Sequence, residues 1–144
     1  MFLFVLFLIA SAEFPVCSAP GDQQNPDICW DGEQFWVVWD DGRDQITDIY
    51  AAMVQESGIA DECFRLYSAE EVSIKTPQMA YYSDSIFLTF WIDDPRYVYG
   101  LLGFVLLNEE GISYWDRHST IYEGNGPIMP VRCRNHFALL YTYG

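Results

Sequence analysis

The chain has 144 residues, of which 51% are hydrophobic and 19% charged, and this matches one globular domain and argues against intrinsic disorder. Aromatic residues make up 17% of the chain, and because they favour pleated, half-buried surfaces, the composition indicates β structure. Twenty-one acidic residues against seven basic ones give a formal net charge of −14, which opposes phosphate backbones and anionic lipids and argues against nucleic acid as a partner.

The N-terminus reads MFLFVLFLIASA, with an apolar run from Phe2 to Ile9 followed by small residues up to Ala12. This outlines a signal peptide, because the run is well below the roughly 20 residues needed to span a bilayer. Cleavage after Ala12 satisfies the small-x-small rule, and cleavage near Ala19 is the alternative. The sequence therefore predicts a secreted or cell-surface protein with no membrane span once the signal peptide is removed.

Four cysteines are widely separated and form no C-x-x-C pair, which excludes the usual zinc and thioredoxin-type spacings. In an oxidising compartment, one or two disulfides are compatible with this spacing, and buried free thiols are equally compatible. The pairing is left open for Cys17, Cys29, Cys63 and Cys133.

A repeat with a period near fifty residues is the main pattern in the chain, and its copies open at Pro26, Pro77 and Pro127. Each copy continues with a short strand, a polar turn, a long aromatic strand, an acidic loop, another strand and a turn with Gly, and the third copy stops in mid-pattern. Such self-similarity is typical of stacked repeat architectures. The expected segments are the signal peptide and mature N-terminal segment at 1–19, repeat one at 20–76, repeat two at 77–126 and an incomplete repeat three at 127–144.

The first copy opens with a hairpin for which Asp31-Gly32 is a strong two-residue turn signal, one residue shorter than the turn of the second copy. The aromatic strand that follows is apolar on both faces, and so is its counterpart in the second copy. Successive side chains of a strand point to opposite sides. Phe35, Val37 and Trp39 therefore oppose Trp36 and Val38, and Ile86, Leu88 and Phe90 oppose Phe87 and Trp91.

The copies are aligned on their aromatic strand ends and acidic loops. The expected equivalents are Trp39, Trp91 and Tyr141; Asp40 and Asp41 with Asp93 and Asp94; and Arg43 with Arg96. The fourth strands are expected from Cys63 to Tyr67 and from Ser119 to Tyr122. No helix longer than a turn is expected, because no segment shows apolar spacing at i, i+3, i+4 and i+7 with caps.

A strand that is apolar on both faces must be covered on both sides. A two-layer sandwich leaves one side of each sheet in water, whereas a propeller blade is packed between two neighbours. The predicted fold class is therefore all-β, a partial β-propeller made of four-stranded antiparallel blades.

The frame P-x-I-x-W-D-G-x-x-F-x-V-V-W-x-D, followed by D-I-Y-A, resembles the β-propeller repeats of large secreted bacterial and archaeal proteins, which share their architecture with sialidase-type propellers. The resemblance covers Pro26 to Tyr143. It implies a propeller fold, on which enzymes, lectins and adhesion modules all occur. The family's Asp-box needs Ser or Thr two residues before the Asp, but Cys29 holds that place before Asp31, which weakens a sialidase interpretation.

Closed propellers typically need four to eight blades, and this chain carries about two and a half. An open stack would leave large aromatic faces in water, at a cost of about 1.5 to 3 kcal/mol for each side chain. We therefore expect either a fragment of a longer propeller or a homo-oligomer in which identical chains complete the ring.

The acidic loops offer oxygen ligands that Ca²⁺ would accept, although their spacing misses the EF-hand pattern. In-loop ion pairing with the adjacent Arg43 and Arg96 is the simpler interpretation, so no cofactor is expected and Ca²⁺ is the alternative. The candidate calcium ligands are Asp40, Asp41, Asp44, Asp93 and Asp94.

No catalytic residue is predicted. The two histidines, His118 and His136, fall at expected turns and stand beside no nucleophile motif. Exposed aromatic rings pack against apolar sugar faces, and the candidates near predicted turns or strand ends are Trp30, Trp36, Trp115 and Tyr82.

The expected function is that of a non-catalytic secreted binding or adhesion module for a protein or glycan ligand. The alternatives are a fragment of a glycoside-hydrolase-like or sialidase-like enzyme, since paired carboxylates are compatible with the many acids, and a lectin assembled from identical subunits.

Overall fold

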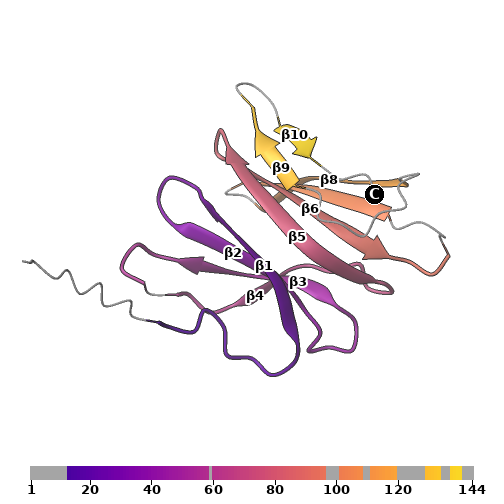
Figure 1. The fold of residues 1–144 in the computed structure, drawn as a ribbon, viewed down its shortest axis with the longest axis horizontal. Helices are drawn as coiled ribbons and strands as arrows, with labels where there is room; N and C mark the ends of the chain where they lie inside the picture. The colour runs from indigo at the N-terminus through magenta and orange to yellow at the C-terminus, as the bar shows by residue number, and fades with distance from the viewer. Residues whose placement is uncertain are drawn as a thin grey trace, which may run out of the picture.

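The computed structural model describes residues 13–58, 60–96, 101–108, 111–119, 129–133 and 137–140, with only the backbone described for 111–119, 132 and 137. The predicted signal peptide, residues 1–12, lies outside this range, as do His136 and Tyr141. The described chain is all-β with antiparallel sheets, as predicted, and contains no helix (Figure 1). Nothing in this part of the chain therefore qualifies as a membrane-crossing helix.

Within the described residues, ten strands form three separate sheets, each built in sequence order. The first sheet contains β1 (Gln23–Trp30), β2 (Phe35–Asp41), β3 (Asp48–Val54) and β4 (Phe64–Tyr67). The second sheet contains β5 (Ser73–Tyr82), β6 (Ser85–Asp93), β7 (Leu101–Asn108) and β8 (Gly111–Ser119). The third sheet is a hairpin of β9 (Met129–Arg132) and β10 (Phe137–Leu140). The first two sheets are thus four-stranded antiparallel meanders, but none of the described sheets closes on itself.

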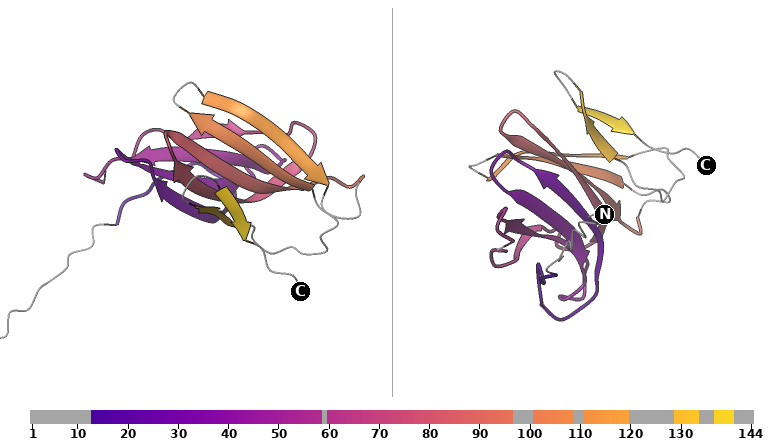
Figure 2. Two further views of the ribbon diagram at one scale, coloured as in Figure 1. Left: turned by 90° about the horizontal axis from the view of Figure 1, so that it is seen from above. Right: turned by 60° about the vertical axis from the view of Figure 1, so that its left-hand side comes forward.

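The sheets follow one another in space through their first strands. β1 contacts β5, and β5 in turn contacts β9, which also touches β6. Figure 2 shows the same succession from two further sides, with the third sheet beside the second. The first strand of each sheet therefore lies next to the first strand of the following one.

The predicted aromatic strands are β2 and β6, and their alternation is confirmed. Val38 faces the second sheet and shares one core with Leu88 and Phe90, which face the first sheet. Trp39 lies on the opposite face of the first sheet, in a second core with Tyr50. Apolar side chains are thus buried on both faces of the first sheet, as the sequence pattern requires.

Each of the two larger sheets carries a β-bulge at the proline that opens its copy of the sequence pattern. The register of β1 shifts between Gln24 and Asp27, and that of β5 between Lys75 and Gln78. The residue before the proline has a positive φ in both, 48° at Asn25 and 56° at Thr76. A left-handed backbone is unusual for a β-branched threonine, so the conformation needs outside support.

Asp40 provides that support to both bulges at once. One oxygen, Oδ2, accepts a hydrogen bond from Asn25 Nδ2 at 2.7 Å and another from the Thr76 backbone N–H at 3.1 Å. Asp27 Oδ2 likewise accepts from the Met79 backbone N–H at 2.6 Å. Two carboxylates of the first sheet therefore hold the first strand of the second sheet in place.

The expected match of Trp39 with Trp91 is wrong. Trp39 pairs across the sheet with Tyr50, and the corresponding pair in the second sheet is Phe90 with Gly103. Trp91 faces Lys75 just before the bulge, where the first sheet has Asp40 facing Gln24. The two tryptophans do not match because the second copy has one more residue between its proline and Trp91 than the first copy has between its proline and Trp39.

The hairpin at Asp31-Gly32 is confirmed as a hairpin but not as a two-residue turn. Its last pair is Trp30 with Phe35, which leaves four residues in the loop, and the Asp31 N–H donates to the Gln34 carbonyl at 3.1 Å. The two-residue turn lies in the second copy, at Ser83 and Asp84, with φ values of 49° and 61°. Such positive values suit the tight turns that match strand twist.

The fourth strand of the first sheet is confirmed within one residue, because β4 begins at Phe64. The fourth strand of the second sheet lies earlier than expected, since β8 begins at Gly111, which pairs directly with Asn108. Of the expected strand from Ser119 to Tyr122, only Ser119 lies within the described residues, as the last residue of β8. The connection between the third and fourth strands is shorter in the second sheet than in the first, which places the fourth strand earlier. His118, expected at a turn, pairs with Leu102 inside β8.

Candidate functional site

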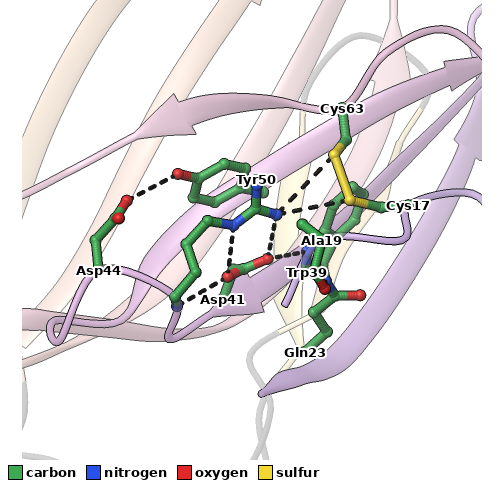
Figure 3. Close-up of polar contacts among 9 residues, drawn as sticks. Cys17, Ala19, Gln23, Trp39, Asp41, Asp44, Tyr50 and Cys63 are labelled. Carbon is green, nitrogen blue, oxygen red and sulfur yellow. Dashed lines mark hydrogen bonds and ion pairs between the residues drawn. A yellow bond between two sulfur atoms is a disulfide. The ribbon is translucent and has the colours of Figure 1, made fainter. Parts of the chain in front are cut away.

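The acidic loop of the first sheet is organised around a paired aspartate and arginine (Figure 3). Arg43 donates from Nε to Asp41 Oδ1 at 2.9 Å and from Nη2 to Asp41 Oδ2 at 2.6 Å, and its backbone N–H adds a third bond to Oδ1. Arg96 makes the same three bonds to Asp94 at 2.7 to 3.0 Å. The predicted in-loop ion pairing is therefore confirmed in both sheets.

The surroundings of Arg43 are aromatic and contain sulfur. Its guanidinium lies 3.9 Å from the centre of the Tyr50 ring, and Nη2 contacts the sulfurs of Cys17 and Cys63 at 3.6 and 3.9 Å. Those two cysteines form a disulfide, which settles a pairing that the sequence left open. The bond ties residues N-terminal to β1 onto the face of the first sheet that points away from the second.

Asp41 is buried, and burial alone would raise its pKa. Hydrogen bonds from Arg43 and from Trp39 Nε1, the latter at 3.0 Å, outweigh that effect and hold the pKa below its ordinary value of 3.8. This carboxylate is thus a permanently charged partner of Arg43 at neutral pH. Its role in the fold is to anchor the Arg43 guanidinium and the Trp39 indole beside each other.

Each of the five candidate calcium ligands accepts a hydrogen bond from another group of the protein. Within the described ranges, no group of three or more His, Cys, Asp or Glu is arranged to hold a metal ion. The donors are Asn25 and Thr76 for Asp40, Arg43 for Asp41, Tyr50 for Asp44, Lys75 for Asp93 and Arg96 for Asp94.

Cys29 and Cys133 carry free thiols. Burial, with added repulsion from the nearby Asp27 and Asp31 carboxylates, raises the pKa of the Cys29 thiol to about 12. The thiol therefore stays protonated at neutral pH and is a poor nucleophile.

The aromatic residues predicted to bind a ligand lie in different places. Trp30 is 37% exposed at the end of β1 and packs on Phe35, with ring centres 4.7 Å apart. Tyr82 is half-buried at the end of β5, and Trp115 lies in β8 opposite Val105, with its side chain outside the description. Among the candidates whose side chains the structure describes, Trp36 is the one that lines the cleft described next.

A cleft of about 530 Å³ opens between the first and second sheets, at the end where the β1–β2 and β5–β6 turns lie. This volume is within the range of small-ligand sites. Three aromatic residues and three acids contribute to its lining, together with smaller apolar and polar groups. The lining residues are Asp31, Glu33, Gln34, Trp36, Met53, Phe64, Leu66, Tyr81, Asp84, Ser85, Ile86, Leu107 and Asn108.

The first-sheet wall of the cleft is held by Asp31. Its Oδ1 accepts the backbone N–H groups of Glu33 and Gln34, each at 2.8 Å, and its Oδ2 accepts Trp36 Nε1 at 2.9 Å. Trp36 then meets Phe64 edge to face, with ring centres 6.4 Å apart. The hydrogen bonds outweigh partial burial and lower the pKa of Asp31 below 3.8, so this wall is both ordered and negatively charged.

The second-sheet wall is formed by Tyr81 and the tight turn after β5. The Tyr81 hydroxyl donates to Asp84 Oδ1 at 3.2 Å, and Asp84 is exposed. Tyr81, Asp84 and Phe64 are site residues that the sequence pattern did not indicate. The available signal was the equivalence of the two hairpins, which puts acids at both turns of neighbouring sheets.

Comparison with known proteins finds no matching family model, no similar curated protein and no similar solved structure.

Proposed function

We propose that the chain is part of an exported, propeller-type module that binds a protein or glycan ligand without chemical conversion. The cleft between the first two sheets is the observation that carries this proposal. It combines a ligand-sized volume, aromatic walls and a few fixed polar groups, which is the usual composition of a recognition site.

Three features support the propeller part of the proposal. The first strands β1, β5 and β9 lie side by side in series, as the inner strands of successive blades do. The first two sheets are meanders of the same order, with the same bulge before the same proline. Both faces of the aromatic strands carry buried side chains.

Exposed apolar side chains on the third sheet favour packing against a further sheet. Met129 is 50% exposed and Leu140 59% exposed, and such apolar groups gain stability when another sheet covers them. In the proposal, that sheet comes from a longer form of the chain or from an identical subunit that completes the ring.

Binding is favoured over catalysis by the state of the cleft carboxylates. A general acid at neutral pH needs a raised pKa, whereas that of Asp31 is lowered by its internal hydrogen bonds. Asp84 is engaged by the Tyr81 hydroxyl and remains exposed to water. These carboxylates are suited to orienting a ligand.

Two neighbouring tyrosines allow a matched test of the site. Tyr81 lines the cleft, whereas Tyr82, the next residue, does not, and both are half-buried. The purified protein would be screened on a glycan array and an extended-peptide array, and the affinity of the best ligand measured by titration calorimetry. We expect Tyr81→Ala to weaken that affinity about tenfold or more, and Tyr82→Ala to change it by less than about threefold.

Failure to retain any member of either array would contradict the proposed function. A loss of affinity in Tyr82→Ala but not in Tyr81→Ala would move the site away from the cleft, towards the position that the sequence suggested.

A further inference from the structure

The cleft has a one-sided charge. Three carboxylates, those of Asp31, Glu33 and Asp84, stand around it, and none of the residues known to line it is Lys, Arg or His. The chain as a whole has a net charge of −14, so the wider field has the same sign. A cationic group entering the cleft would therefore be attracted both locally and from a distance.

The aromatic and aliphatic side chains of the cleft add a second, independent preference. The rings of Trp36, Phe64 and Tyr81 occur together with Met53 and Leu66 in one lining. Aromatic faces attract ammonium and guanidinium groups, and apolar walls accommodate the methylene stems of lysine and arginine. A long side chain with an apolar stem and a cationic head satisfies both parts of this surface.

We infer that the cleft binds a lysine or arginine side chain presented by an extended segment of a basic protein. This inference rests on the proposed binding function and names the ligand chemistry of the same site. The cleft is larger than one side chain, which leaves room for the flanking backbone.

The negative charge of the cleft persists across the physiological range. The hydrogen bonds to Asp31 that fix Trp36 also keep its pKa below the ordinary value, so the carboxylate is ionised well below neutral pH. The field and the ring orientation thus depend on the same contacts, and a cationic ligand would meet a preformed site.

The test uses a short peptide with three consecutive lysines, capped at both ends, and calorimetry in about 50 mM salt, where screening is moderate. The cleft variant is Glu33→Gln with Asp84→Asn, in which the new asparagine still offers Oδ1 to the Tyr81 hydroxyl. The matched control is Asp61→Asn with Glu62→Gln, two exposed carboxylates that do not line the cleft. Both double variants remove the same net charge.

We expect the cleft variant to raise the Kd of the lysine peptide about tenfold and the control variant to raise it less than threefold. A peptide with glutamine in place of lysine should bind wild type about tenfold more weakly than the lysine peptide. An unchanged near-ultraviolet circular dichroism spectrum would exclude misfolding of the variants.

Equal losses in the two double variants would overturn the inference, since binding would then follow overall charge. Absence of binding both to the lysine peptide and to the same peptide with arginine in place of lysine would overturn it as well. Maltotriose binding that Tyr81→Ala abolishes and the charge variant leaves intact would overturn the cationic ligand while keeping the binding function. Loss of every ligand on both arrays is the separate result that contradicts the function itself.

Discussion

The first and second sheets share their strand order, their proline bulge and their Asp–Arg pair, but they differ in how those features are enclosed. In the first sheet, Arg43 is held among Tyr50 and the disulfide, and its side chain is 19% exposed. In the second sheet, the equivalent Arg96 is 67% exposed. The same local motif therefore has a different environment because residues N-terminal to β1 fold back over the first sheet.

One register position shows the same contrast in the cores. Trp39 stacks on Tyr50 in the first sheet, with ring centres 6.5 Å apart. In the second sheet, the Phe90 ring lies over Gly103 and packs 4.9 Å from the ring of Tyr67 in β4. The first sheet fills this position with two large rings, whereas the second sheet places one ring over a glycine. Single substitutions at these positions should therefore affect the two sheets unequally.

The largest effect is expected from Gly103→Ala. An added methyl group would overlap the Phe90 ring, and the central strand gives the ring little room to move. We expect the free energy of unfolding to fall by about 3 kcal/mol, measured by urea denaturation followed through tryptophan fluorescence. The control is Gly42→Ala, where the nearest atom would be 3.9 Å away and the change should stay within about 0.5 kcal/mol.

A smaller side chain opposite the glycine would test the cause. Adding Phe90→Leu to Gly103→Ala should restore part of the lost stability, since the overlap with the ring is removed. If both glycine variants were equally stable, the described packing of Phe90 on Gly103 would be wrong.

The next effect concerns the disulfide of the first sheet. The bond closes a loop with a sequence separation of 46 residues, so its removal by Cys17→Ser should lower the free energy of unfolding by about 2 to 3 kcal/mol. Urea denaturation with and without a reducing agent would measure this difference. Reduction should lower the stability of wild type and leave Cys17→Ser unchanged.

Cys29→Ala serves as the matched control, because Cys29 lies in the same sheet with a free thiol. It should retain the full response to reduction. A wild type that is indifferent to reduction would argue against the bond between Cys17 and Cys63.

The smallest expected effect is the difference in stability loss between substitutions of Arg43 and of Arg96. Arg43→Gln leaves the buried Asp41 carboxylate without its guanidinium and should lower the free energy of unfolding by about 2 to 3 kcal/mol. Arg96→Gln should lower it by about 1 kcal/mol, since the mostly exposed Arg96 is already partly screened by water. Urea denaturation at neutral pH compares the two variants directly.

The Asp41–Arg43 pair should also make the stability of the protein depend on pH in a definite direction. The lowered pKa of Asp41 contributes stability above its ordinary value of 3.8, and that contribution is lost as the pH falls through the folded-state pKa. The difference between wild type and Arg43→Gln should therefore shrink as the pH falls below 3.8. A difference that grew with acidity would contradict the assigned ion pair.

The sequence predicted those parts of the fold that depend on local pattern. Alternation along residues 35–39 identified a strand that is buried on both faces, and β4 was predicted to within one residue. The match of Trp39 with Trp91 failed because residue types were aligned without the register of the neighbouring strand. Pairing across the sheet, which identifies Phe90 as the equivalent of Trp39, is a tertiary property.

The cleft was harder to predict for the same reason. Trp36 was identified by its place near a predicted turn or strand end, but Asp31 and Asp84 gain their role only when two turns 53 residues apart in sequence meet across the sheets. No local sequence periodicity predicts that these two turns lie close together. The pairing of Cys17 with Cys63 is similar, since spacing alone allowed several partners.

The disulfide has a consequence for maturation, if the chain is exported as we propose. A signal peptidase acting near Ala19 would discard Cys17 along with the leader, leaving Cys63 with no partner and uncovering the Trp39 and Tyr50 core. Processing at Ala12 keeps the half-cystine in the mature polypeptide. The disulfide thus favours cleavage of the signal peptide after Ala12, in which case the mature protein would begin at Glu13.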